Sequence, residues 1–87
     1  MIPTLHIEKQ EPGLYLCRVL EGRAEVAEYD CPTIGSSIRE AAQAYPDAIA
    51  WHIWYGHVCI GTTMRLNMIH DPETLALKAM ALHGQVR

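Results

Sequence analysis

Five side chains within one short stretch of the sequence have the chemistry to bind a ligand or a partner. Side chains alternate across a strand, so a hairpin over residues 48–66 would bring these five to one face. Tryptophan offers a broad amphipathic surface, histidine donates or accepts a hydrogen bond near neutral pH, and arginine can recognise an anion. The candidate ligand or interface residues are His52, Trp54, Cys59, Thr63 and Arg65.

The same stretch lacks the set of groups that nucleophilic catalysis requires. An activated cysteine needs a base and a group that orients the base. Cys59 and His52 could share a face, but their hairpin contains no acid. Ser36 and Ser37 precede a helix, and capping explains them more simply than nucleophilic chemistry. We therefore assign no catalytic residue and expect a non-catalytic protein, with a small-ligand binder or minor enzyme on this face as the alternative.

The histidines and the nearby cysteine do not have the spacing of a metal site. His52, His57 and Cys59 lie within eight residues, and His70 follows. However, His57 is expected in a turn, while His52 and Cys59 point from strands. Structural zinc needs four converging ligands, usually paired at short separation. The sequence predicts no metal and no cofactor.

Charge is distributed unevenly along the chain. Its formal net charge is −3, and its seven Lys and Arg residues form no basic stripe, which disfavours a nucleic-acid partner. Residues 1–47 hold eight acids and four bases, whereas residues 48–70 hold only Arg65. The charge-poor stretch must be buried or form an interface. We expect a homodimer or another protein as partner, with a small ligand as the alternative.

The cysteines and the hydropathy pattern indicate the cellular compartment in which the protein is expected. Cys17, Cys31 and Cys59 are odd in number and have no CxxC spacing. The chain does not start with a basic region followed by an apolar run. No apolar run approaches the roughly 20 residues needed to cross a bilayer. These features predict reduced thiols, a cytoplasmic location and no membrane association.

Hydrophobic periodicity and turn residues place the elements within one domain, residues 1–87. Apolar and β-branched residues alternate on each side of a glycine-containing turn in two separate segments, and each segment is followed by an amphipathic helix. The start of the chain alternates only weakly. The predicted elements are an arm or edge strand over 1–12, a hairpin over 13–29, a helix over 36–45, a hairpin over 48–66 and a helix over 71–84.

Capping residues define the ends of both helices. Ser37 and Glu40 fit a capping box at the start of the first helix. Asp71 suits the N-cap of the second, and Pro72 suits its first position, where a missing N–H is harmless. Gly84 suits the left-handed conformation that ends many helices.

The second hairpin gives the most specific functional expectation. With Gly56 first in a two-residue turn, an apolar face is predicted on one side and a mixed face on the other. The predicted pairs are Tyr55 with Val58, Ile53 with Ile60, Trp51 with Thr62 and Ile49 with Met64. The predicted fold is an α+β two-layer sandwich of order ββαββα. Its four-stranded antiparallel sheet can gain a fifth strand from the arm, and both helices cover one face. We expect an interaction or accessory module that self-associates through the mixed face.

Overall fold

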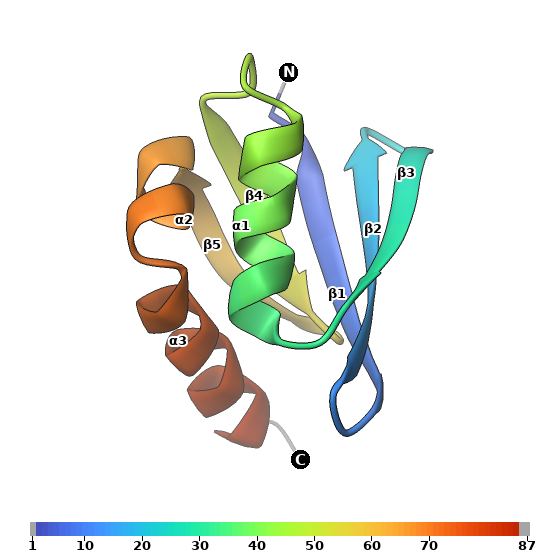
Figure 1. The fold of residues 1–87 in the computed structure, drawn as a ribbon, viewed down its shortest axis with the longest axis vertical. Helices are drawn as coiled ribbons and strands as arrows, with labels where there is room; N and C mark the ends of the chain where they lie inside the picture. The colour runs from blue at the N-terminus through green and yellow to red at the C-terminus, as the bar shows by residue number, and fades with distance from the viewer. Residues whose placement is uncertain (1, 86–87) are drawn as a thin grey trace.

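The structure is a computed structural model that describes residues 2–85, with five strands and three helices (Figure 1). The α+β class expected from the sequence is confirmed. The strands are β1 (Thr4–Glu11), β2 (Leu14–Glu21), β3 (Ala24–Cys31), β4 (Ala50–Tyr55) and β5 (Val58–Met64). The helices are α1 (Ile34–Ala44), α2 (Arg65–His70) and α3 (Pro72–Gln85).

The arm provides the central strand of the sheet, where the sequence predicted an edge strand or a loose segment. The strand order is β3-β2-β1-β4-β5. Strand β1 pairs antiparallel with β2 and parallel with β4, and the other neighbours are antiparallel. The two expected hairpins, each followed by a helix, are present, but the expected wholly antiparallel sheet is wrong because β1 and β4 are parallel. The fifth strand is present, but it joins the two hairpins instead of extending one of them.

Burial explains why a weakly patterned segment takes the central position. Leu5 and Ile7 alternate with polar residues in β1, and both are fully buried. Gly13, with φ of +80°, lies in the tight turn from β1 into β2. That conformation is open to glycine at little cost. Two apolar residues give a weak signal in a sequence, but here they lie between two neighbouring strands and beneath the helices.

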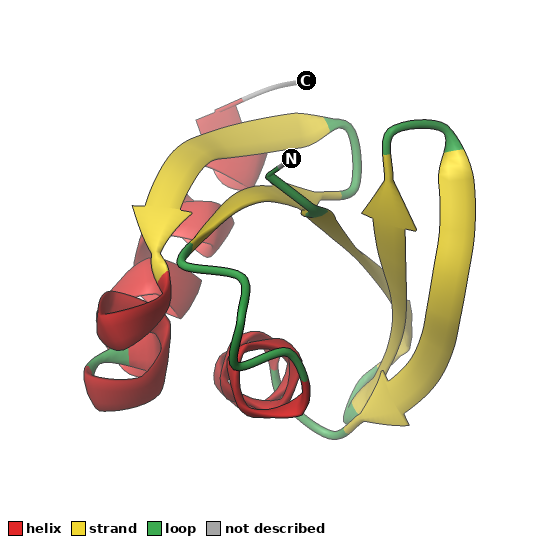
Figure 2. Cartoon of the chain, turned by 90° about the horizontal axis from the view of Figure 1, so that it is seen from above, coloured by secondary structure: helices red, strands yellow, loops and turns green. Residues whose placement is uncertain are grey.

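The three helices lie on one side of the sheet, which curls around α1 (Figure 2). The fully buried side chains include Ile38 and Ala41 from α1 and Trp51 and Ile53 from β4. A helix with one apolar stripe and a sheet with one apolar face bury these surfaces against each other. The opposite face of the sheet carries no helix from residues 2–85. We call it the open face.

Helix α1 begins earlier than the sequence predicted. Thr33 is its N-cap, and its Oγ1 accepts a hydrogen bond from the Ser36 amide at 3.0 Å. Ser36 returns the interaction, because its Oγ accepts from the Thr33 amide at 3.2 Å. The expected box of Ser37 and Glu40 is replaced by this pair. Ser37 is buried, and its hydroxyl donates to the Thr33 carbonyl at 2.8 Å.

The C-terminal region contains one helix more than expected. Helix α2 follows β5 directly, and Asp71 separates it from α3. Asp71 Oδ1 accepts hydrogen bonds from the amide and the hydroxyl of Thr74 at 3.4 and 2.9 Å, and Pro72 opens α3. Gly84 does not end this helix, which continues to Gln85 without a positive φ at the glycine. Within residues 2–85, no helix is long and apolar enough to cross a membrane.

The capping pair of α1 gives a direct test of this start site. Replacing Thr33 with alanine removes the acceptor for the Ser36 amide, and we expect the free energy of unfolding to fall by about 1 kcal/mol. Thr33→Ser keeps the hydroxyl and should retain most of that stability. Urea unfolding followed by circular dichroism measures both. An equal loss in the two variants would contradict a capping role for the hydroxyl.

Candidate functional site

Strand β4 places its side chains as the sequence predicted. Trp51, Ile53 and Tyr55 are buried on the helix-covered side. His52 and Trp54 lie between them in the alternation and belong to the open face, where Trp54 is 36% exposed. Together with Cys59, which pairs with Trp54 and is exposed, three of the five candidate residues therefore occupy the expected face.

A register shift between β4 and β5 changes the other half of the hairpin. Trp54 pairs with Cys59, but Ile53 pairs with Gly61, so one extra residue is accommodated in β5. Gly61 has φ of +105°, a conformation that other residues rarely adopt. The expected pair Tyr55 with Val58 is confirmed, but the bulge moves every later pair by one residue. The expected pairs that are wrong for this reason are Ile53 with Ile60, Trp51 with Thr62 and Ile49 with Met64.

The bulge exchanges the roles of two neighbouring threonines. Thr63, expected on the mixed face, pairs with Trp51 and is buried on the helix-covered side. Thr62 takes its place on the open face, and its Oγ1 lies 2.7 Å from His52 Nδ1. In an unbulged hairpin, strict alternation would have put Thr63 on the same face as His52.

Arg65 also leaves the predicted face, because the chain turns into α2 at this residue. Its Nε donates a hydrogen bond to the Ala42 carbonyl at 2.9 Å. Ala42 lies in the last turn of α1, where carbonyls lack partners within the helix. Arg65 therefore joins two helices. Met64, which pairs with Ala50, is the last residue of β5 and is 53% exposed.

The strand registers align the open face into rows that cross all five strands. Residues that pair across neighbouring strands lie side by side on one face of a sheet. The first row contains Glu28, Arg18, His6, Trp54 and Cys59. The second row contains Glu25, Leu20, Thr4, His52 and Thr62.

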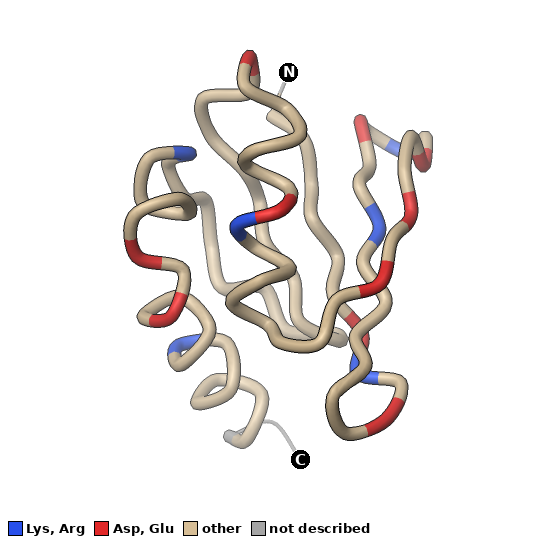
Figure 3. The backbone as a smooth tube through the Cα atoms, in the orientation of Figure 1, with Lys and Arg blue, Asp and Glu red and all other residues tan. Residues whose placement is uncertain are grey.

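The β3 side of the open face is acidic. Arg18 lies 3.2 Å from Glu25 and 3.7 Å from both Glu28 and Glu8. Such half-exposed pairs each contribute up to about 1 kcal/mol. Because one guanidinium faces three carboxylates, this side carries an excess of negative charge. Figure 3 shows acidic positions on β3 and none along β4 and β5.

The β4–β5 side carries polar groups that already have local hydrogen-bond partners. His6 Nε2 lies 2.7 Å from the Gly56 carbonyl, and His52 is bonded to Thr62. The Gly61 amide donates to Cys59 Sγ at 3.4 Å. Within the described residues, no hydrogen bond joins a cysteine to a histidine, and no three His, Cys, Asp or Glu side chains are grouped to hold a metal ion. These side chains therefore make their hydrogen bonds to neighbouring groups within residues 2–85.

Exposed apolar side chains surround a hollow at the end of this surface. The hollow is about 360 Å³ in volume and is lined by Pro46, Ile49, Met64, Arg65 and Leu66. Ile49 is 71% exposed and Leu66 is 61% exposed. Sequence reasoning did not name these two residues as site residues, although the charge-poor stretch over residues 48–70 contains both.

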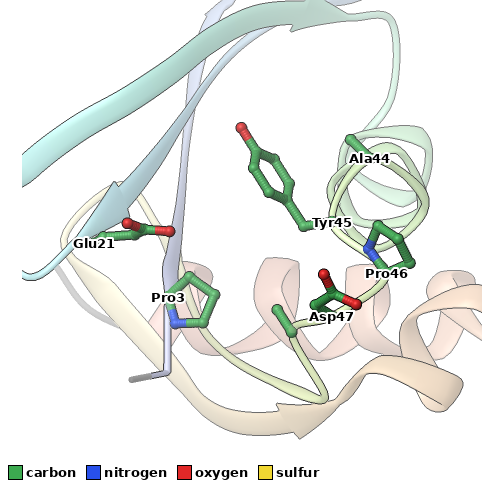
Figure 4. Close-up of a pocket in the computed structure, with 7 residues that line it drawn as sticks. Pro3, Glu21, Ala44, Tyr45, Pro46 and Asp47 are labelled. Atoms are coloured by element: carbon green, nitrogen blue, oxygen red, sulfur yellow. The ribbon is translucent and has the colours of Figure 1, made fainter.

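A second hollow of about 370 Å³ lies beyond the C-terminal end of α1. Pro3 and Glu21 lie on one side, the segment 44–48 lies on the other, and the Tyr45 ring stands between them (Figure 4). Among the described residues that line it, Glu21 and Asp47 are charged. This hollow is large enough to accommodate a small polar group.

The three cysteines are free and differ in environment. Cys59 is exposed, Cys31 is half-buried and Cys17 belongs to the core. Burial raises the pKa of the Cys17 thiol from 9.0 to about 11. Burial also raises the pKa of Tyr29, whose hydroxyl donates to the Ser37 carbonyl at 2.8 Å. A thiol kept protonated in this way is a poor nucleophile.

The chain matches no family model, no curated protein and no solved structure.

The buried thiol predicts a loss of stability at alkaline pH. Between pH 9 and 11 the folded protein keeps the Cys17 proton, whereas the unfolded chain releases it. The free energy of unfolding should therefore fall as the pH rises, by up to about 1.4 kcal/mol per pH unit for this proton. Urea unfolding at several pH values measures the slope. Cys17→Ala should reduce it and Cys59→Ala should not, so equal slopes would exclude Cys17 as the titrating group.

Proposed function

We propose that this protein is a non-catalytic interaction module that self-associates through the outer surface of β4 and β5. We call this surface the neutral surface. It includes the open-face side chains of the hairpin and the apolar residues beside them. Its members are Ile49, Ala50, His52, Trp54, Cys59, Thr62, Met64 and Leu66.

The observation that carries the proposal is that large apolar side chains are exposed on an uncharged surface. Residues 48–70 include a single formal charge, Arg65, and its Nε is hydrogen-bonded to α1. Exposed apolar patches of this kind commonly mark interaction sites. Burying them stabilises an association by roughly 25 cal/mol for each Å² of apolar surface removed from water.

Charge favours a second copy of the chain as the occupant. The chain has a net charge of −3, so two copies repel each other at most orientations. The neutral surface lets two identical molecules approach without placing like charges opposite one another. Trp54 and Met64 are residue types enriched at interfaces, and Trp54 provides a rigid anchor at the end of the surface beside the β4–β5 turn.

A small apolar ligand is the second candidate, and the hollow beside Met64 supports it. Its lining is mainly apolar, with one arginine at the rim. A volume of about 360 Å³ lies at the lower end of the range for ligand sites. A ligand there would compete with self-association, because both use Ile49, Met64 and Leu66.

Matched leucine variants test the proposed interface. Leu66 and Leu77 are both helical and are 61% and 63% exposed, but Leu77 lies on α3, outside the neutral surface. We expect light scattering to report a dimer for the wild type and for Leu77→Glu. Leu66→Glu should be a folded monomer, because dimerisation would bury its charge. If Leu77→Glu disrupted the dimer and Leu66→Glu did not, the interface would lie on α3 and the proposal would be contradicted.

Trp54→Glu tests whether the interface extends over the open face. It should weaken the dimer at least tenfold, as expected for an anchor that contributes about 1.4 kcal/mol or more. Circular dichroism checks that the variant is folded. A wild-type protein that is monomeric at all concentrations would contradict self-association, and ligand screening by tryptophan fluorescence would then test the second candidate.

A further inference from the structure

Strand β3 presents an unpaired edge. It is the outermost strand in the order β3-β2-β1-β4-β5, and its only strand neighbour within residues 2–85 is β2. It is eight residues long and contains no proline. At the other edge, β5 runs directly into α2 and also packs against α3. The free amides and carbonyls of an edge strand can pair with an added strand.

The two faces beside this edge differ in chemistry. Glu28 and Asp30 lie on the open face, and a register shift at Val26 brings Glu25 to the same face. The single base opposite them, Arg18, already contacts Glu25 and Glu28. On the helix-covered side the strand presents half-buried, mainly apolar groups. These residues are Ala27, Tyr29 and Cys31.

The same charges disfavour pairing of β3 with a second copy. A two-fold antiparallel pairing would place Glu25, Glu28 and Asp30 of both strands on one shared face. Like charges facing each other across strands are destabilising. The acids therefore protect the edge from self-association and leave it attractive to a strand of opposite charge.

We infer that the outer edge of β3 binds an extended segment of a partner protein in which Lys or Arg alternates with apolar residues. The segment adds a sixth strand to the sheet. Its basic side chains lie over Glu25, Glu28 and Asp30, and its apolar side chains lie beside Ala27, Tyr29 and Cys31. The backbone hydrogen bonds supply affinity and the alternation supplies specificity. The inference concerns the edge opposite the neutral surface and does not depend on self-association.

A peptide that alternates lysine and valine over eight residues is a suitable probe. Labelled with fluorescein, it should bind the full-length protein at low ionic strength and bind more weakly as salt is added. Two control peptides have the same sequence and carry N-methyl groups on alternate backbone amides, each on a different set of alternate residues. Each keeps its charge, but its methylated edge cannot form backbone hydrogen bonds with a strand. We expect one of the two methylated registers to abolish binding.

Matched charge variants locate the site. Glu28→Gln with Asp30→Asn should weaken peptide binding by about five- to tenfold, because two cross-strand charge pairs are lost. Asp47→Asn with Asp71→Asn removes the same charge from exposed positions in the loop after α1 and between α2 and α3, and binding should stay within about twofold of the wild type. Hydrogen exchange should show added protection in β3.

Three results would overturn the inference. The first is no binding of the peptide even at low salt. The second is binding that survives methylation in both registers, which would indicate attraction by charge alone. The third is an equal loss of affinity in the two double variants, which would place the peptide elsewhere. None of these results depends on the oligomeric state that light scattering reports.

Discussion

Parallel pairing between β1 and β4 is the interaction on which the rest of the structure depends. It joins a three-stranded antiparallel unit, β3-β2-β1, to the hairpin β4-β5. A parallel pair needs a long crossover, and α1 lies within that connection. The crossover places α1 over the buried side chains of Leu5, Ile7 and Ile53. Without this pairing, the two hairpins would share neither a sheet nor a core.

The continuous sheet also creates the surface that carries the proposed functions. Because the helices occupy one side, the polar side chains of all five strands are left together on the other. Charge separates within that face. Arg18 and its carboxylate partners occupy the β3 side, while His52 and Trp54 occupy an uncharged side. One small domain thus presents two chemically different surfaces, and we propose a like molecule as the partner of the uncharged one and a basic strand as the partner of the acidic edge.

The bulge at Gly61 shows how a single backbone feature determines the membership of a site. It turns Thr62 outward and Thr63 inward, and it leaves Met64 at the exposed end of β5. The surface is consequently more apolar and less charged than an unbulged hairpin would make it. Arg65, released from the strand, instead satisfies a carbonyl at the end of α1. The same local change therefore stabilises the helical layer and alters the chemistry of the open face.

The sequence by itself determined the features that depend on near neighbours. Alternation placed Trp51 and Ile53 inside and His52 and Trp54 outside, and the Asp71-Pro72 pair marked the start of a helix, since strand periodicity and capping are local effects. Only the tertiary structure decided what depends on distant partners. It made residues 4–11 the central strand, shifted the register at Gly61 and placed Arg65 against α1. These outcomes follow from burial and hydrogen bonds between segments far apart in the chain, which no local pattern records.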